Sequence, residues 1–410
     1  MSESTVSPDL DRLIAGMPKA ELHIHLEGSV QPATAIELAR RHDLVHTLPT
    51  TDPARLADWF EFTDFADFIR VITAVQNLIR TPDDFALVAY QAGAAMAEQN
   101  IRYSELTVSP YNHTHIFDKG LNIAAILSGL DEGRKSAKAD FGVEMRWVFD
   151  IARNFCFSGP GGVYDPHPAD TTLRYALEGQ ENGVVALGIG GNEEGRPPEP
   201  FAHAFLEAGR QGLGRVPHAG ESLAPWAAGH VRGSVETLGA DRIGHGIGVI
   251  SDPHLLALLL DRAIPLEVCP TSNLRTRVCD RLSLHPFPHL DGMGLMITLN
   301  SDDPPMFGNT LNDEYRLLST GFGYGADDLA RIARNAFTAA LCEPALRRSL
   351  LEEFDAWARR SGVFEKELST SAPQGDIDSI CGMVEGSPFD MASDGRSINE
   401  EATARLASDG

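Results

Sequence analysis

The chain has 410 residues, of which 43% are hydrophobic, so it can bury a large core within the size range of a single α/β barrel. Its net charge of −24 repels polyanions, which argues against nucleic-acid binding. The first residues carry neither a basic run nor an apolar stretch, and no segment approaches the roughly 20 apolar residues of a membrane span. The sequence therefore predicts a soluble, cytoplasmic protein with no membrane or nucleic-acid partner.

The five cysteines are widely scattered, and no two of them form a C-x-x-C pair. This pattern favours neither a disulfide framework nor a thiolate zinc site. We expect reduced, mostly buried thiols at Cys156, Cys269, Cys279, Cys342 and Cys381.

A predicted strand near the N-terminus, within residues 18–28, holds two histidines two residues apart. Successive side chains of a strand point to opposite faces, so His23 and His25 project from the same face. Two imidazoles on one rigid face can form half of a metal site. An isolated pair of this kind fits two ordinary strand histidines equally well, and the interpretation depends on partners elsewhere in the chain.

A helix is expected from Ser29, as its N-cap, through Arg41. Residues 52–99 then indicate a helical insertion after the first strand. An aromatic run in its first half predicts a helical layer packed over another part of the fold, either as a core stripe or as a cover over a ligand. The run consists of Trp59, Phe60, Phe62, Phe65 and Phe68.

Beyond residue 100, short apolar runs alternate with helical segments. With the opening strand they give eight strands joined by crossovers, the pattern of a parallel (β/α)8 TIM barrel. We expect residues 1–366 to form this barrel domain. Residues 367–410 are rich in Ser, Gly, Asp and Glu and predict a flexible tail. The predicted strands after the first are Ile101–Val108, Val143–Asp150, Gly183–Gly190, Val216–Gly220, Arg242–Gly246, Ile264–Cys269 and Leu295–Asn300.

Polar residues gather where several predicted strands end, the place where such barrels carry catalytic groups. One polar residue at a strand end is more often structural, whereas their joint occurrence favours a functional site. A catalytic metal of borderline softness binds imidazole and carboxylate ligands and keeps one position for water, which it activates as a nucleophile. The expected ligands are His23, His25, His218 and Asp302.

Three further residues at these strand ends have expected roles in the chemistry. His245 is placed to act as a base or orienting group for the water, and Glu221 to act as the proton donor. A glutamate in that role must be protonated, which a desolvated pocket favours by raising its pKa. Asp303, next to the ligand Asp302, is expected to accept a hydrogen bond from the substrate.

Five segments, in this order along the chain, resemble the motifs of the adenosine deaminase family of the amidohydrolase superfamily. The resemblance spans about Met17 to Arg360, and the set is far more specific than any one segment. The segments are His23–Gly28, His218–Glu221, Arg242–Gly246, Cys269–Asn273 and Asn300–Pro304.

The resemblance implies a barrel with one Zn²⁺ per subunit that removes the 6-amino group of a purine as ammonia. Glu221 would protonate N1, while His245 would steady the attacking hydroxide. Asp303 would contact N7, and the backbone of Gly191 would lie near N3. The predicted strand Gly183–Gly190 lacks a lysine that could bridge two metals, which agrees with a single ion.

Two positions depart from typical adenosine deaminases and concern the group attached at N9. Glu27 replaces an Asp that contacts the ribose 5′-hydroxyl, and Asn192 replaces the Asp of a Gly-Asp-Glu segment. Adenosine or 2′-deoxyadenosine, converted to inosine or 2′-deoxyinosine, is the leading substrate. Adenine and 6-aminodeoxyfutalosine are alternatives, and a non-catalytic purine-binding protein is a remote one. The oligomeric state stays open.

Overall fold

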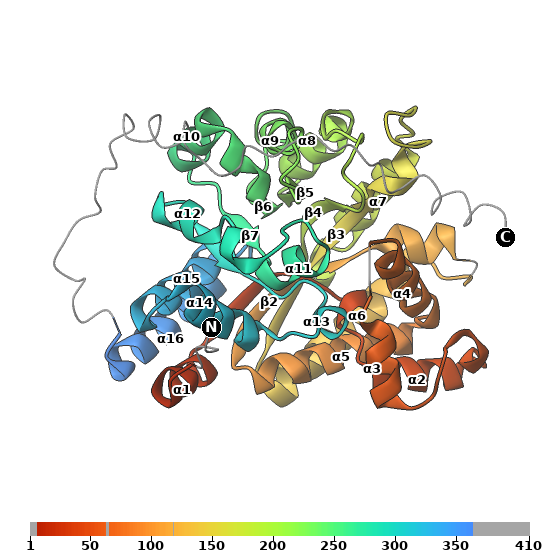
Figure 1. The fold of residues 1–410 in the computed structure, drawn as a ribbon. Coiled ribbons are helices and arrows are strands. Elements are labelled where there is room, and N and C mark those ends of the chain that lie inside the picture. Colours follow the sequence, from red (N-terminus) through yellow and green to blue (C-terminus); the bar gives the residue numbers. More distant parts are fainter. Residues whose placement is uncertain (1–5, 63–64, 118, 364–410) are drawn as a thin grey trace.

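The structure is a computed structural model that describes residues 6–62, 65–117 and 119–363. Its centre is one sheet of eight parallel strands whose spatial order follows the chain order (Figure 1). The predicted tail, residues 367–410, and Cys381 within it lie outside the described residues. The strands are β1 (Lys19–His25), β2 (Ile101–Val108), β3 (Glu144–Ala152), β4 (Val184–Gly190), β5 (Gly214–Ala219), β6 (Ile243–His245), β7 (Leu266–Val268) and β8 (Ile297–Leu299).

The sheet returns on itself where the segment after β8 meets β1. The amide of His25 donates to the carbonyl of Asp302 (2.9 Å), and the amide of Asp302 donates to the carbonyl of His23 (3.2 Å). The side-chain oxygen of Asn300 accepts from the amides of Leu22 and His23. These bonds nearly close the barrel, so the predicted (β/α)8 fold is confirmed.

Helices surround the strands, with α2 to α4 on one side of the view in Figure 1 and α14 to α16 on the other. In the described part of the chain, no helix has the length and apolar character needed to cross a membrane. The helices are α1 (Pro8–Gly16), α2 (Pro32–Arg41), α3 (Pro53–Phe60), α4 (Phe65–Leu78), α5 (Pro82–Glu98), α6 (Ile123–Phe141), α7 (His167–Glu178), α8 (Ala202–Arg210), α9 (Ala227–Gly233), α10 (Pro253–Asp261), α11 (Pro270–Arg275), α12 (Phe287–Gly292), α13 (Pro304–Phe307), α14 (Leu311–Phe322), α15 (Ala326–Ala339) and α16 (Pro344–Ser361).

The start of α2 differs from the expectation. Ser29 does not cap this helix, because residues Glu27–Ser29 form a short 3-10 turn and the Ser29 hydroxyl donates to the carbonyl of His25 (2.6 Å). The helix begins instead at Pro32, whose fixed φ suits the first helical position. The turn holds Glu27 and Gly28 close to the end of β1.

The predicted helical interval 52–99 holds α3, α4 and α5, and α5 packs against β2 and α6 as part of the barrel's own helical ring. Part of the predicted aromatic layer covers the segment that follows β8. The rings of Phe62 and Phe68 lie 5.4 Å and 5.6 Å from that of Phe307, at the end of α13. The aromatic run therefore joins the N-terminal helices to the loop that carries Asp303.

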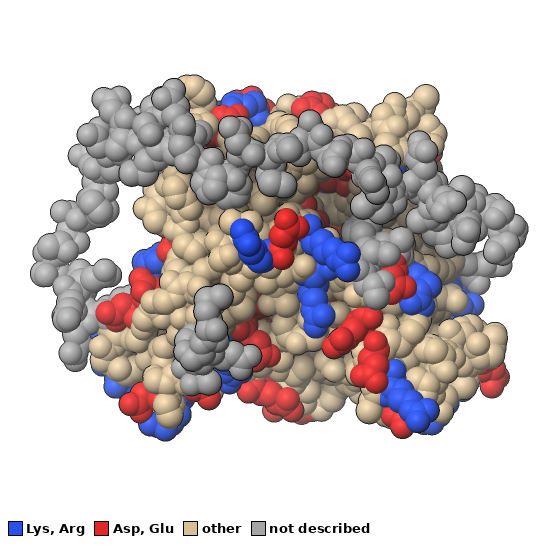
Figure 2. All heavy atoms as spheres, in the orientation of Figure 1, with Lys and Arg blue, Asp and Glu red and all other residues tan. Residues whose placement is uncertain are grey.

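The surface of the face seen in Figure 2 mixes acidic and basic side chains. The four cysteines among the described residues are free and buried, as expected: Cys156, Cys269, Cys279 and Cys342.

Candidate active site

Three strands bring three histidines and one aspartate together at their carboxyl ends. His23 and His25 come from β1, His218 from β5, and Asp302 follows β8. The Nε2 atom of His25 lies 3.4 Å from both His218 Nε2 and Asp302 Oδ1, and His23 Nε2 lies 3.7 Å from the same Asp302 oxygen. The four predicted ligands therefore form one cluster.

The backbone around this cluster adopts conformations that side chains seldom take. His245, the last residue of β6, has φ +59°, and Asp302 has φ +68°. Left-handed backbone at residues other than glycine costs on the order of 1–3 kcal/mol and is concentrated at functional sites. Close packing adds a further constraint, because a Cβ on Gly244 would lie 2.8 Å from Cε1 of His23. The side chains of His245 and Asp302 therefore reach the cluster from strained backbone conformations.

Glu267, on β7, fixes the orientation of His23. Its carboxylate accepts a hydrogen bond from His23 Nδ1 (2.8 Å), so the lone pair of Nε2 faces the other histidines. Burial lowers the pKa of His23, but the bond to Glu267 and the charge of Asp302 raise this pKa overall, which makes the ring a stronger ligand. Nε2 itself is buried without a hydrogen-bond partner. An unpartnered imidazole nitrogen beside two more imidazoles and a carboxylate fits a zinc ion.

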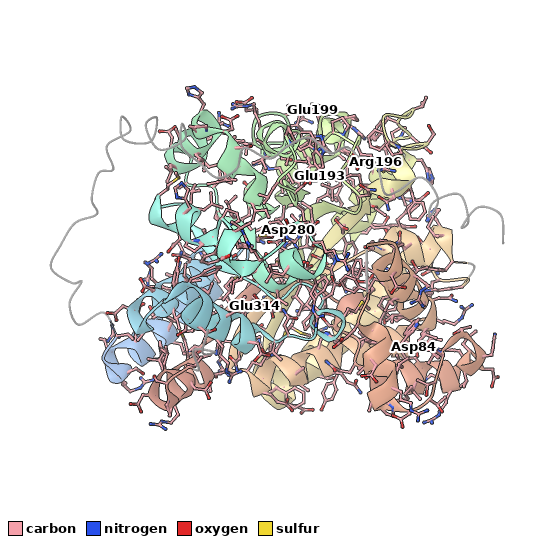
Figure 3. The ribbon with its side chains drawn as sticks, viewed as in Figure 1. Asp84, Glu193, Arg196, Glu199, Asp280 and Glu314 are labelled. Atoms are coloured by element: carbon pink, nitrogen blue, oxygen red, sulfur yellow. The ribbon has the colours of Figure 1, made fainter. Side chains whose placement is uncertain are left out.

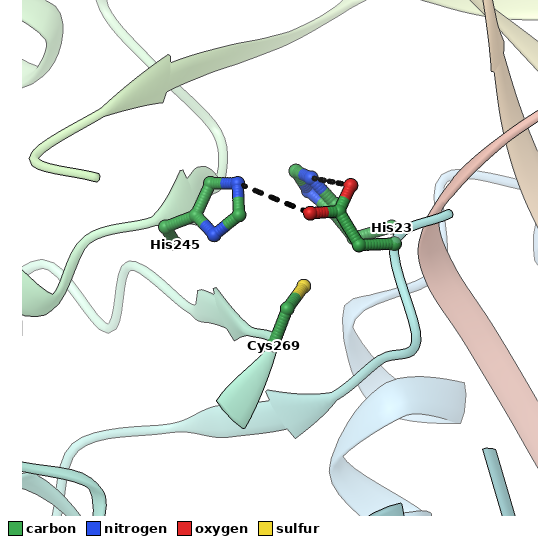
Figure 4. A group of neighbouring side chains, drawn as sticks. His23, His245 and Cys269 are labelled. Atoms are coloured by element: carbon green, nitrogen blue, oxygen red, sulfur yellow. Dashed lines mark ion pairs between the residues drawn. The ribbon is translucent and has the colours of Figure 1, made fainter. Parts of the chain in front are cut away.

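Cys269 also lies beside this cluster, within reach of His23, His245 and Asp302 (Figure 4). Burial, together with the charge of Asp302, raises the pKa of its thiol well above the ordinary value. The protonated thiol contacts the carbonyl of Glu267 (3.7 Å). Because metals bind the thiolate, the three histidines with Asp302 are the better ligand set.

Glu221 and His245 lie next to each other beside the cluster, with 3.6 Å between Glu221 Oε2 and His245 Nε2. Desolvation, helped by the charges of Asp302 and Glu193, raises the pKa of Glu221 to about 8. Burial lowers the pKa of His245 to about 3. At neutral pH the pair therefore combines a protonated carboxylic acid with a neutral imidazole, which are the states that a proton donor and an orienting base require.

Asp303 is buried in contact with the turn after β1. A Cβ on Gly28 would overlap the Asp303 carboxylate, so only glycine permits this approach. Burial and the charge of Asp302 raise the pKa of Asp303 well above its ordinary value, and its Oδ1 has no hydrogen-bond partner. A raised pKa favours the protonated form of Asp303, which can donate a hydrogen bond.

Gly191 and Glu27, the other two predicted substrate-contact residues, lie at different strand ends. Gly191 follows β4 with φ +93°, a conformation that favours glycine. Glu27 follows β1, and its Oε1 accepts from the amide of Ser109 (3.0 Å) and lies 3.1 Å from His113 Nε2. Burial raises the pKa of Glu27, but these two bonds lower it below the ordinary value. The Glu27 carboxylate is therefore ionised and already engaged with residues that follow β2.

Several buried residues support the site but were not given roles from the sequence. Ser272 donates to Asp302 Oδ2 (2.7 Å), and Arg242 bridges Glu267 and Glu105 at 2.5 Å to each. Glu267 is a charged residue between two apolar ones in β7, a signal that could have identified it. The supporting residues are Glu105, Arg153, Glu193, Arg242, Glu267 and Ser272.

Comparisons with known proteins agree with this arrangement. The sequence model of the adenosine deaminase family matches residues 18–357. The chain is 41% identical to the aminodeoxyfutalosine deaminase of Streptomyces avermitilis, over 85% of this chain and 93% of that protein. It is 33% identical to the adenine deaminase of Zymomonas mobilis, over 80% and 92% respectively. A crystal structure of an amidohydrolase from Burkholderia ambifaria with bound Zn aligns with a TM-score of 0.76 at 26% identity, over 88% of this chain and 97% of that one.

These matches cover most of the barrel, and the chain belongs to the adenosine deaminase family. It is a deaminase, a hydrolase that acts on the C–N bond of an adenine-like substrate. The resemblance seen in five short segments of the sequence is thereby confirmed.

Proposed function

We propose that this protein is a zinc-dependent deaminase that replaces the 6-amino group of a purine with oxygen and releases ammonia. One observation carries the proposal, namely the convergence of three imidazoles and Asp302 beside a glutamic acid that keeps its proton. His23, His25, His218 and Asp302 would hold one zinc ion. When bound, zinc lowers the pKa of a water molecule and so supplies the nucleophile.

The remaining roles follow from the protonation states of the side chains. Glu221 donates its proton to ring nitrogen N1, which is possible at neutral pH because its pKa is about 8. His245 is neutral and orients the attacking water through Nε2. Asp303 is protonated and donates to N7, an acceptor on the purine. Gly191 is assigned to the N3 edge of the ring.

For the group at N9, we propose aminodeoxyfutalosine as the substrate, ahead of adenosine. The 41% identity to an aminodeoxyfutalosine deaminase supports this choice. Glu27 stands where typical adenosine deaminases have Asp, and its Oε1 is engaged by Ser109 and His113. Adenosine, the leading substrate predicted from the sequence, stays a prediction. The experiment below compares it directly with aminodeoxyfutalosine.

Adenine is the second candidate, supported by the 33% identity to the adenine deaminase of Zymomonas mobilis. The assigned roles of Glu221, His245 and Asp303 concern only the purine ring, so the same residues serve either substrate.

The decisive experiment compares zinc-loaded protein on four substrates: aminodeoxyfutalosine, adenine, adenosine and 5′-deoxyadenosine. We expect kcat/KM for aminodeoxyfutalosine to exceed that for adenosine by at least about 10-fold, the discrimination that one pocket contact supplies. Faster turnover of adenine would reverse the order of the two candidates. A protein inert toward every 6-aminopurine, but still able to bind purines, would be a binding protein instead.

A further inference from the structure

The turn that carries Glu221 is held by a buried carboxylate from the neighbouring strand end. Glu193, three residues after β4, accepts from the amide of Gly220 with Oε1 (2.8 Å) and from the amide of Glu221 with Oε2 (3.2 Å). One side chain therefore binds two successive peptide groups, including that of Glu221 itself. Figure 3 shows Glu193 close to Arg196 in this part of the molecule.

Glu193 is itself fixed by two cationic or donor groups. His230 on α9 places Nδ1 3.1 Å from Glu193 Oε1, and Arg153, directly after β3, places Nη1 4.0 Å from the same oxygen. Burial raises the pKa of Glu193, but His230 and Arg153 lower it below the ordinary value. The side chain is only 8% exposed. An ionised, buried carboxylate with four partners is a rigid support.

The turn is also constrained from its other side. Gly220 has φ +69°, and its carbonyl accepts from the amide of Gly248 (3.0 Å). A Cβ on Gly220 would lie 2.5 Å from Val231 Cγ2. Gly220 is therefore held at its carbonyl by Gly248 and at its amide by Glu193. Glu193 also binds the amide of Glu221, so it fixes the direction in which Glu221 leaves the turn.

We propose that Glu193 is the positioning residue for the proton donor, holding the Glu221 backbone so that its carboxyl group reaches the purine ring. The proposal rests on the function proposed above and adds a residue that does not touch substrate. Proton transfer demands hydrogen-bond geometry, and a displacement of about 1 Å can cost 10²-fold in rate. Loss of the clamp should therefore slow the chemical step more than it weakens binding.

The test replaces Glu193 with Gln and uses Glu194→Gln, the same change at the next and exposed position, as the matched control. The side-chain amide of Gln has one acceptor oxygen and one donor NH2 group. The NH2 group would face one of the two backbone N–H donors and could not accept its hydrogen bond. For Glu193→Gln we expect kcat to fall about 10–100-fold with KM within about 3-fold of the parent. The control should keep parent kinetics, and both variants should keep the parent zinc content.

Amide hydrogen exchange provides a readout that needs no turnover. A peptide covering residues 216–226 should exchange faster in Glu193→Gln than in Glu194→Gln, because the Gly220 and Glu221 amides lose a charged acceptor. Unchanged exchange, or an unchanged kcat in an active parent, would overturn the proposal. If the parent proves inactive on all 6-aminopurines, the proposed function fails while the exchange result still decides the role of Glu193.

His230→Ala serves as a second variant in case Glu193→Gln does not fold. It leaves the Glu193 carboxylate in place but removes one of its partners. We expect a smaller fall in kcat and faster exchange in the same peptide. A folded His230→Ala protein with parent kcat and parent exchange would count against the proposal.

Discussion

The pKa values of two carboxyl groups of the site, Glu221 and Asp302, are shifted in opposite directions. Desolvation raises the pKa of Glu221 to about 8, whereas for Asp302 the neighbouring histidines and the hydrogen bond from Ser272 outweigh burial and lower the pKa. Environments that push two acids apart in this way separate a proton donor from a group that stays charged. Glu221 and Asp302 can therefore serve in different roles a short distance apart.

Replacing Glu221 with Gln tests the first of these roles at the level of a single residue. The amide cannot deliver a proton to N1, so we expect kcat to fall by about 10²–10⁴, the usual cost of losing a general acid. KM and zinc content should stay near those of the parent, since Glu221 is not among the expected ligands. Parent-like kcat in steady-state assays would remove Glu221 from the mechanism.

At the scale of a structural element, strand β7 supports the proposed metal site through one side chain. Glu267 links His23 to Arg242, and Arg242 continues the chain of charges to Glu105 on β2. The network crosses the barrel interior, where all four side chains are nearly inaccessible to water. A carboxylate that accepts a hydrogen bond from a ligand histidine sets the orientation and basicity of that histidine.

Glu267→Gln should weaken zinc binding by about 10–100-fold, because His23 loses its anionic partner. Competition with a chelator, carried out on folded protein, measures this affinity. Glu105→Gln is the matched control, since it breaks the other ion pair of Arg242 without touching His23. Both variants lose stability through a broken buried pair, but only Glu267→Gln is expected to lose zinc affinity. Equal affinities in the two variants would contradict the proposed support of His23.

The sequence identified the strands well because parallel barrel strands are buried on both faces and appear as apolar runs bounded by polar ends. The predicted Ile101–Val108 coincides with β2, and the histidines and aspartates at strand ends converge as expected. The predicted start of α2 was wrong because the Ser29 hydroxyl bonds back to the carbonyl of His25, four residues earlier, and the helix begins at Pro32 instead. Glu105, Arg242 and Glu267 were missed because a lone charge in a strand gives no sign of its partner 25 or more residues away.

On the scale of the whole molecule, buried acids make stability depend on pH. Glu314 on α14 is fully buried, accepts from Asn309 Nδ2 (2.6 Å), and has a pKa that burial raises to about 7 (Figure 3). Between pH 4.5 and 7 the folded state then binds more protons than the unfolded chain. This group therefore lowers the free energy of unfolding as pH rises through that window.

Glu314→Gln should remove this contribution. A shift from 4.5 to about 7 corresponds to on the order of 3 kcal/mol, so the variant should lose less stability than the parent between pH 4.5 and 7. Urea unfolding at a series of pH values measures the slope. The exposed Glu352 on α16, changed to Gln, is the control and should leave the slope unaltered. If the free energy of unfolding of Glu314→Gln changed with pH as steeply as that of the parent, Glu314 would be ionised in the folded protein.

The contacts that close the barrel join β1 to the segment after β8, which is synthesised much later. Asn300 accepts from the Leu22 amide across 278 residues of sequence, and Asp302 pairs with the backbone of His23 and His25. A chain still emerging from the ribosome holds its first two histidines long before it holds the last carboxylate. Contacts of such high sequence separation form late in folding. The proposed ligand set is therefore complete only once the chain has been synthesised as far as Asp302, with all eight strands made.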